Sequence, residues 1–503
     1  MVDILLTHSY HLFYDRKQVR KMQPYPPLGT LYAAGLLRQH GFSVAVFDSM
    51  LHNPEDGFRA ALASHRPRVV AIYEDNFNFL SKMCLSRMRQ LAFEMIDAAR
   101  SAGATVVVNG PDASDHAEEY LRRGSLYVLL GEAEWTLLEL LRSLFGRSDQ
   151  QPATIPGVTF LQDYGRLFRA PSRPLLRDLD ALPLPARDLV NHDAYREAWK
   201  AQHGFFSLNL VASRGCPYRC NWCARPIYGD AFHLRSAESV AREMKELKEI
   251  YGAEHLWFAD DVFGLQHGWI SVLADAVERY AARVPFKIQT RVNLVTPETA
   301  TALRRAGCAE VWMGAESGSQ KILDAMEKGT CVAQAVSARE HLRHQGIRAC
   351  FFLQFGYPGE GWEEIQQTVS LVRRTCPDDI GVSLSYPLPN TVFYERVRTQ
   401  MGEKQNWTDS DDLCVMFRAA YTDQFYHAIR DALHLEVASY ANTPAVGISP
   451  ARVRRAWDRV ARLETSCRNA NPTSLPELQG ADRDVTGARL VPLSRLSLSA
   501  GEA

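Results

Sequence analysis

The sequence predicts an α/β protein in which an N-terminal doubly wound parallel sheet is followed by a partial (β/α)6 barrel and a helical C-terminal region. Three observations support this fold class. Short apolar segments alternate with helical segments up to about residue 145, a second alternating series begins near residue 205, and helical patterns without strands follow residue 400. Apolar strands that alternate with helices are typical of parallel sheets covered on both faces.

The first series, residues 1–145, contains five strand–helix units. Strands are expected at residues 3–8, 42–49, 68–75, 105–110 and 127–132. Helices are expected at residues 28–41, 54–65, 80–102, 114–124 and 133–145. A domain of this kind is Rossmann-like, and its ligand is expected at the carboxyl ends of the strands.

Residues 146–204 are rich in proline and irregular, and we interpret them as a linker that contains a hairpin. The second series, residues 205–400, has expected strands at residues 207–212, 255–260, 286–292, 310–316, 349–356 and 380–389. Six such units predict a barrel whose active-site groups lie at the carboxyl ends of its strands. Residues 401–470 form a helical region, and residues 471–503 are expected to be disordered because aromatic residues are scarce there.

The composition excludes several classes of protein. The formal net charge is −1, which offers no concentrated basic surface for a nucleic acid. No apolar run of about 18 residues occurs, so no membrane span is expected, and the start "MVDILLTHSY" lacks the basic region of a signal peptide. Ten cysteines are too few for a disulfide scaffold. We therefore expect a cytoplasmic chain with reduced thiols, in which a tight group of cysteines indicates metal binding or catalysis.

Such a group occurs in "VASRGCPYRCNWCARPIYG", residues 211–229, directly after the first strand of the second series. Cys216, Cys220 and Cys223 form a C-x3-C-x2-C pattern. Three thiolates can hold three irons of a 4Fe–4S cluster and leave the fourth iron open, as a catalytic site requires. A structural zinc site is the alternative, with His233 as the fourth ligand, and a chance grouping is the other.

This pattern, with an aromatic residue before the last cysteine, resembles the radical S-adenosylmethionine (SAM) superfamily. The resemblance implies that the open iron binds the amino and carboxylate groups of SAM. It also implies that one-electron reduction cleaves SAM to a 5′-deoxyadenosyl radical, which abstracts hydrogen from an unactivated carbon. Because oxygen attacks an exposed cluster, activity is expected only under anaerobic and strongly reducing conditions.

Later motifs extend the resemblance over about residues 205–400. They are "WFADDVFG", "QTRVNLVTPE", "VWMGAESGSQKILDAMEKG" and "FFLQFGYPGEGWEEIQQT". The resemblance assigns SAM binding to residues in these motifs and in the cysteine loop, namely Trp222, Asp261, Arg291, Gly314, Glu316, Ser317 and Gln354.

A parallel five-strand domain in front of such a barrel resembles the cobalamin-binding subfamily, in the group of the anaerobic magnesium-protoporphyrin cyclases and class B methyltransferases. The stretches "PYPPLGTLYAAGLLRQHGFSVAVFD", "VVVNGPDAS" and "LLGEAEWTLLELL" carry the likeness. It assigns cobalamin binding to Pro27, Leu28, Gly29, Gly110, Pro111, Gly131 and Glu132. The related methylthiotransferases need three cysteines in this domain, whereas only Cys84 occurs.

Two features leave cobalt ligation open. The D-x-H-x-x-G motif, whose histidine binds cobalt, is absent, and His8 and His11 are interpreted as loop residues rather than ligands. "YEDNFNFL" places Glu74, Asp75, Asn76 and Asn78 at the end of the third strand. These side chains either contact cobalamin or the barrel, or form the capping turn of the next helix.

The favoured function is methyl transfer to an unactivated carbon by a cobalamin-dependent radical SAM enzyme. The alternatives are radical oxidation or cyclisation, a radical SAM enzyme without cobalamin, and an iron–sulfur protein that carries electrons or senses redox state. The expected partners are a small-molecule substrate and a low-potential electron donor such as a flavodoxin or ferredoxin, with no nucleic acid and no membrane.

Overall fold

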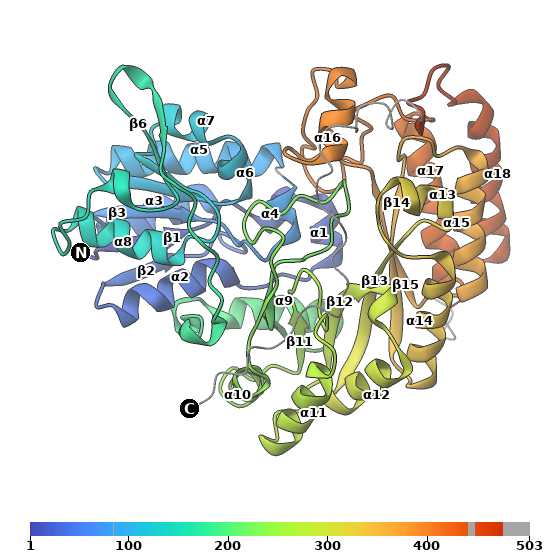
Figure 1. The fold of residues 1–503 in the computed structure, drawn as a ribbon, viewed down its shortest axis with the longest axis horizontal. Helices are drawn as coiled ribbons and strands as arrows, with labels where there is room; N and C mark the ends of the chain where they lie inside the picture. The colour runs from blue at the N-terminus through green and yellow to red at the C-terminus, as the bar shows by residue number, and fades with distance from the viewer. Residues whose placement is uncertain (84, 441–447, 476–503) are drawn as a thin grey trace.

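The computed structural model describes residues 1–83, 85–440 and 448–475. Cys84 and most of the tail for which the sequence predicts disorder lie outside the described residues. The α/β fold class is confirmed. One sheet belongs to the N-terminal part of the chain, at the left of Figure 1, and a second, curled sheet follows it at the lower right.

The N-terminal sheet has the strand order β2-β1-β3-β4-β5-β6-β7. Its first five strands pair in parallel: β1 (Ile4–Thr7), β2 (Val44–Phe47), β3 (Val69–Tyr73), β4 (Thr105–Asn109) and β5 (Tyr127–Leu129). The hairpin of β6 (Val158–Leu161) and β7 (Leu167–Arg169) adds two antiparallel strands beside β5. The hairpin predicted in the linker is thus an extension of this sheet.

Helices cover both faces of this sheet because its strands are apolar on both sides. Ile4 and Leu6 pack toward the core that includes α2 and α8, whereas Leu5 packs toward the core that includes α3, α5 and α7. The helices of this part are α1 (Arg16–Lys21), α2 (Leu28–Gln39), α3 (Pro54–His65), α4 (Phe79–Lys82), α5 (Ser86–Ser101), α6 (Pro111–Asp115), α7 (Ala117–Arg123) and α8 (Glu134–Leu144).

The chain reverses its direction of winding between β1 and β3, which are neighbours in the sheet. A ligand of such a sheet binds in the crevice outside the carboxyl ends at this point. The long helix predicted at residues 80–102 is interrupted there: α4 is a short helix of the loop after β3, and α5 begins only at Ser86. Figure 1 places α4 between the two sheets.

The second sheet is entirely parallel and has the order β15-β14-β13-β12-β11-β8. Its strands are β8 (Ser207–Leu210), β11 (His255–Phe258), β12 (Phe286–Arg291), β13 (Cys308–Glu316), β14 (Arg348–Phe355) and β15 (Asp379–Leu384). Within the described residues the sheet stays open between β8 and β15, which makes the barrel partial, as predicted.

Helices cover the outer face of this barrel. They are α10 (Ala237–Glu249), α11 (Trp269–Arg279), α12 (Pro297–Ala306), α13 (Gln320–Ala325), α14 (Val332–His344) and α15 (Trp362–Thr375). Helix α16 (Val392–Val397) follows β15 and lies at the top of Figure 1. Helix α9 (His192–His203) precedes the barrel, and α17 (Asp423–Ala438) and α18 (Pro450–Ser466) follow it, with α17 against β15. Among the described residues, no helix is long and apolar enough to span a membrane.

Candidate active site

The three cysteines lie on a loop that leaves the carboxyl end of β8. The short strands β9 (Ser213–Arg214) and β10 (His233–Leu234) pair antiparallel and close this loop at its base. Gly215 follows β9 with φ +82°, and a Cβ atom there would lie 2.2 Å from the carbonyl oxygen of Ala231. Only glycine therefore allows the loop to fold back on itself directly before its first cysteine.

Local hydrogen bonds fix the course of this cysteine loop. The Arg225 guanidinium donates to the carbonyls of Cys216 at 3.1 Å and Tyr218 at 2.8 Å, and the Cys223 amide donates to the Cys220 carbonyl at 3.1 Å. Burial, together with the other two thiols, raises the pKa of Cys223 to about 12. Among the described residues, no three His, Cys, Asp or Glu side chains converge on one metal ion. Three thiols on one loop suit a cluster in which each binds a separate iron.

Arg291, at the end of β12, is the cation beside Cys220. Its Nη1 lies 3.5 Å from the Cys220 Sγ, and its guanidinium stacks over the Tyr218 ring with 3.6 Å to the centroid. Its Nη2 donates to the carbonyl of Lys328. Arg291 is thus held from three sides, and its charge can offset the negative charge that a bound thiolate adds.

A buried ion pair lies behind Arg291. The Lys328 Nζ is 2.7 Å from Oε1 of Glu316, and both side chains are only 7% exposed. Glu316 ends β13 with φ +57°, a left-handed conformation that is strained for a residue other than glycine. A Cβ at Gly314 would lie 2.6 Å from the Glu316 Oε1 and 2.7 Å from the Lys328 Nζ, so glycine makes room for the pair. The Lys328 Nζ is 5.9 Å from the Trp222 ring centroid, which brings the pair to the cysteine loop.

The two aspartates after β11 differ in their surroundings. Asp260 is buried and accepts hydrogen bonds from the Ala212 amide at 3.1 Å and from the Ser213 hydroxyl. Burial nevertheless raises the pKa of Asp260 to about 7. Asp261 points to the other half of the molecule, where its Oδ1 pairs with the Nζ of Lys82 on α4.

Ser317 and Gln354 are bonded to neighbouring elements of the barrel. The Ser317 hydroxyl lies 3.2 Å from that of Thr368 and accepts from the Ser319 amide at 3.1 Å. The Gln354 side chain donates to the Ser385 hydroxyl at 3.0 Å. Both are buried at the carboxyl ends of β13 and β14, at the same rim as Glu316.

The carboxyl edge of the N-terminal sheet brings the predicted glycines to the end of β3. A Cβ at Gly29 would lie 3.0 Å from the Asn76 amide nitrogen, and one at Gly110 would lie 2.6 Å from the Glu74 Cγ. The Asp75 Oδ1 accepts from the Gly29 amide at 3.0 Å. These two glycines therefore allow the loops after β1, β3 and β4 to pack closely.

A chain of amide groups crosses this edge. The Asn76 Nδ2 donates to the Asn109 Oδ1 at 3.0 Å, and the Asn109 Nδ2 donates to the carbonyls of Leu129 and Gly131. This order leaves the Asn76 Oδ1 buried without a hydrogen-bond donor. A Cβ at Gly131, where φ is +69°, would lie 3.6 Å from the carbonyl of Ile227 in the cysteine loop. The edge of the N-terminal sheet and the cysteine loop are therefore in contact.

The remaining predicted residues of this edge lie at the N-terminal ends of helices. Pro27 precedes α2, Leu28 is its buried first residue, and Pro111 is the first residue of α6. Asn78 accepts from the Leu80 amide at 3.0 Å, so the capping interpretation is confirmed for this residue.

Arg214 joins the two halves of the site. It is 3% exposed, and its guanidinium lies 2.5 Å from the Glu132 carboxylate and 2.9 Å from the Glu134 carboxylate. The other Glu132 oxygen accepts from the Leu176 amide at 2.6 Å. The guanidinium also lies over three aromatic rings, those of Tyr32, Phe77 and Tyr228. Glu132, predicted to bind a cofactor, thus has both carboxylate oxygens engaged by the protein.

Hydrogen bonds engage both ring nitrogens of His8 and the Nδ1 of His11 in the first loop. The Nε2 of His8 lies 2.9 Å from the Asp48 carboxylate, and its Nδ1 lies 3.3 Å from the Ser49 hydroxyl. The Nδ1 of His11 lies 2.7 Å from the Ser49 carbonyl. Burial lowers the pKa of His11 and keeps its ring neutral.

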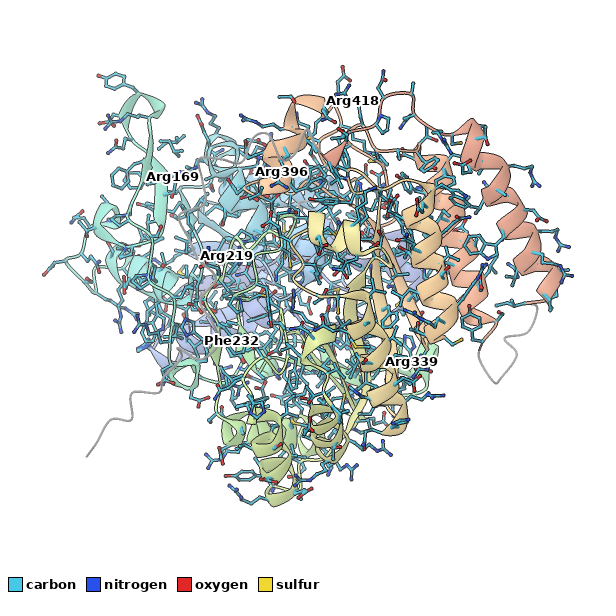
Figure 2. The ribbon with its side chains drawn as sticks, turned by 45° about the vertical axis from the view of Figure 1, so that its right-hand side comes forward. Arg169, Arg219, Phe232, Arg339, Arg396 and Arg418 are labelled. Atoms are coloured by element: carbon cyan, nitrogen blue, oxygen red, sulfur yellow. The ribbon has the colours of Figure 1, made fainter. Side chains whose placement is uncertain are left out.

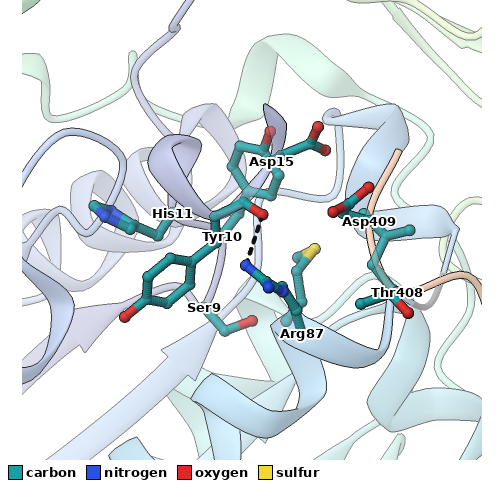
Figure 3. A pocket seen from close by; sticks show the side chains of 10 residues that line it. Ser9, Tyr10, His11, Asp15, Arg87, Thr408 and Asp409 are labelled. Carbon is teal, nitrogen blue, oxygen red and sulfur yellow. Dashed lines mark hydrogen bonds between the residues drawn. The ribbon is translucent and has the colours of Figure 1, made fainter. Parts of the chain in front are cut away.

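A small pocket separates this loop from the C-terminal part of the chain (Figure 3). It is lined by polar groups, among them those of Ser9, Tyr10, His11, Asp15, Arg87, Thr408 and Asp409. The Asp15 carboxylate accepts from the amide and hydroxyl of Ser410 at 3.2 and 2.7 Å, which fastens the first loop to the C-terminal segment.

Sequence reasoning missed four charged residues of this junction: Lys82, Arg214, Glu134 and Lys328. Arg214 and Lys328 lie inside quoted motifs, directly before "GCPYRC" and within "DAMEKG", and a buried charge in a motif is a signal that could have been used. Glu134 also lies inside a quoted stretch, "LLGEAEWTLLELL", whereas Lys82 lies on a helix whose pattern contains other charged residues, so nothing local distinguishes Lys82.

Comparison with known proteins agrees with this arrangement. The model of the radical SAM superfamily matches residues 210–372, and that of the B12 binding domain matches residues 22–141. An uncharacterized methyltransferase of Pyrococcus horikoshii is 25% identical over 374 residues, which cover 74% of this chain and 78% of the relative. The anaerobic magnesium-protoporphyrin IX monomethyl ester cyclase of Rubrivivax gelatinosus is 22% identical over 394 residues, covering 76% and 67%.

The fold also resembles a solved structure. The cobalamin-dependent S-adenosylmethionine radical enzyme OxsB, with aqua-cobalamin and S-adenosylmethionine bound, superposes with a TM-score of 0.68 at 17% identity, covering 92% of this chain and 71% of that chain. At this identity the likeness concerns the fold. The two domain matches, rather than this likeness, carry the assignment: the chain contains a radical SAM superfamily domain at residues 210–372, preceded by a B12-binding domain at residues 22–141.

Proposed function

We propose that the protein transfers a methyl group to an unactivated carbon of a small-molecule substrate. The observation that carries this proposal is the contact between the cysteine loop and the carboxyl edge of the N-terminal sheet, through Gly131 and Ile227 and through Arg214 and Glu132. A cluster site and a corrin site that share one junction suit a substrate held between them. We favour methylation over the cyclase reaction because the uncharacterized methyltransferase of Pyrococcus horikoshii matches this chain with higher identity, and over more of its own length, than the cyclase of Rubrivivax gelatinosus does.

The residues of the barrel fit an iron–sulfur cluster and SAM. Cys216, Cys220 and Cys223 would hold the cluster as three thiolates, for which each must lose its proton. The Trp222 Nε1 is buried without a partner, as expected of a donor that awaits a ligand. We assign SAM binding to Trp222 and to Asp261, Arg291, Gly314, Glu316, Ser317 and Gln354, with Gly314 acting through the Glu316–Lys328 pair.

The N-terminal edge fits a corrin held without a histidine from the protein. The unpaired Asn76 Oδ1 offers an acceptor, and the side-chain amides of a corrin are donors. We assign cobalamin binding to the edge formed by Pro27, Leu28, Gly29, Gly110, Pro111, Gly131 and Glu132, with Glu132 acting through its bonds to Arg214 and the Leu176 amide. Because Asp48 and Ser49 engage both ring nitrogens of His8, we propose that His8 does not bind cobalt.

When bound, the cluster, SAM and cobalamin supply one-electron cleavage chemistry and a transferable methyl group. The chain positions these groups and excludes water from them. Arg291 offsets charge at Cys220, the Glu316–Lys328 pair stays buried beside Trp222, and Arg214 fixes the cysteine loop against the N-terminal domain.

The products of SAM test this proposal. The anaerobic holoenzyme, reduced and given a substrate, should form S-adenosylhomocysteine and 5′-deoxyadenosine together, because methyl transfer consumes one SAM as methyl donor and a second as radical source. A mass spectrum of the product should show one added methyl group. Formation of 5′-deoxyadenosine without S-adenosylhomocysteine, alongside an oxidised or cyclised product, would reject methyl transfer in favour of the cyclase reaction.

We further propose that a flavodoxin or ferredoxin supplies electrons in the cytoplasm. The described cysteines are all free thiols, as a reducing compartment requires. Arg219, labelled in Figure 2, is 66% exposed on the cysteine loop and pairs with Asp230 at 3.4 Å, an exposed pair that an acidic donor could open.

A further inference from the structure

An ion pair crosses from the N-terminal domain to the barrel directly beside the cysteine loop. The Nζ of Lys82, on α4, contacts the Oδ1 of Asp261, which follows β11. The two side chains are 14% and 24% exposed, so the pair is largely withdrawn from solvent. Charges in this setting interact strongly, and removal of either one leaves the other poorly compensated.

Hydrogen bonds tie the aspartates after β11 to the base of the cysteine loop. Asp260, the neighbour of Asp261, accepts from the Ala212 amide at 3.1 Å and from the Ser213 hydroxyl, just before the first cysteine. Strand β11 also pairs in parallel with β8, whose carboxyl end leads into this loop. The Lys82–Asp261 pair therefore lies at the rim from which the cysteine loop leaves the barrel.

The kind of ligand that suits this pair follows from its charges. A ligand with one charge would bind one partner and strand the other, whereas a ligand that carries a carboxylate and an amino group can pair with both. The methionyl end of SAM has these two groups and is held at the cluster.

We propose that Lys82 and Asp261 bind the carboxylate and the amino group of SAM, respectively, so that SAM is held by both domains. This inference rests on the proposed function, since it requires a cluster that binds SAM. It adds a residue of the B12-binding domain, Lys82, to a SAM site that the sequence assigns wholly to the barrel.

The test measures SAM binding rather than turnover, with the full-length anaerobic holoenzyme. Lys82→Met should weaken the binding of radiolabelled SAM in equilibrium dialysis by about 10- to 100-fold, the range of a charge-assisted hydrogen bond. Lys82→Arg should restore most of the affinity because it keeps the charge. Lys404→Met, which breaks the Lys404–Asp412 pair far along the chain, should leave the affinity unchanged.

Decarboxylated SAM separates a direct contact from a structural effect. The wild-type enzyme should bind SAM more tightly than decarboxylated SAM, and Lys82→Met should lose about 10-fold or more of that preference, since it cannot contact the carboxylate. A general loss of folding would weaken the binding of both ligands equally and leave the ratio of their two affinities unchanged.

The outcomes also separate this inference from the proposed function. If the wild-type enzyme carries the cluster and binds SAM, and Lys82→Met binds it with the same affinity and the same preference over decarboxylated SAM, the role of Lys82 is refuted and the proposed function stands. If Lys82→Met instead weakens only the binding of the substrate and leaves that of SAM unchanged, the pair belongs to the substrate site. That result equally refutes the inference. A wild-type holoenzyme that fails to bind SAM overturns both.

Discussion

Replacement of Cys216, Cys220 or Cys223 by alanine is expected to reduce SAM cleavage to background. Each thiolate binds its own iron, so the loss of one leaves two anchors for a cluster of four irons. The loop between β9 and β10 contains no further cysteine that could replace one of the three. Iron per chain and 5′-deoxyadenosine formed under reducing conditions measure the effect.

Cys376→Ser is the matched control, because Cys376 is an exposed thiol at the end of α15, away from the cysteine loop. It should retain the iron content and the SAM cleavage of the wild-type protein. Full SAM cleavage by any one of the three alanine variants would show that the corresponding cysteine is not a ligand.

Arg214→Met is expected to destabilise the protein by about 3–5 kcal/mol, the usual result of removing one partner from a buried charge network. The variant leaves the carboxylates of Glu132 and Glu134 buried without their cation. It also loses the stacking on three rings and loosens the loop two residues before Cys216. Because the chain has more than one domain, the readout is the first thermal midpoint, which should fall by about 10 °C.

The loss of thermal stability caused by Arg214→Met should become smaller as the pH is lowered. Burial raises the pKa of Glu132 in the wild-type protein, and Arg214 opposes that increase. Without the guanidinium the pKa rises further, and a carboxyl whose pKa is raised by folding destabilises the native state as the pH rises through it. The thermal midpoint of the variant should therefore approach that of the wild type as the pH is lowered from 8 to 5.

Two further variants check this explanation. Adding Glu132→Gln and Glu134→Gln to Arg214→Met removes the stranded charges and should recover much of the stability. Arg122→Met, which breaks an exposed pair with Glu118, should change the stability of the protein by no more than about 0.5 kcal/mol. A variant Arg214→Met with a wild-type midpoint at pH 8 would show that the network does not hold the two halves together.

Much of this fold could be predicted because its signals are local. The apolar segments of β1, β3 and β4, the helical spacing of α2 and the spacing of the three cysteines are each contained in a run of at most twelve residues. The helix predicted at residues 80–102 failed for the opposite reason. Its first turn, α4, is set apart by a tertiary contact, since Lys82 pairs with Asp261 across the junction.

The ion pairs that join the two halves of the site could not be predicted because the two residues of each pair are far apart in the sequence. Arg214 meets Glu132 across 82 positions, and Lys82 meets Asp261 across 179. The sequence pointed to Glu132 and Gly314 as residues that contact a cofactor. In the structure Glu132 is held by Arg214 and Leu176, and Gly314 makes room for the Glu316–Lys328 pair. Such roles depend on which side chains face each other after folding, which spacing alone does not contain.

The most direct test of the central claim is the cofactor content of the protein. Purified without oxygen from cells supplied with iron and cobalamin, it should contain about four iron and four sulfide atoms and about one corrin per chain, with an ultraviolet–visible spectrum that shows both. A protein that binds iron and sulfide but no corrin, even after reconstitution with cobalamin, would contradict the assignment of the N-terminal domain and the methyl transfer that depends on it.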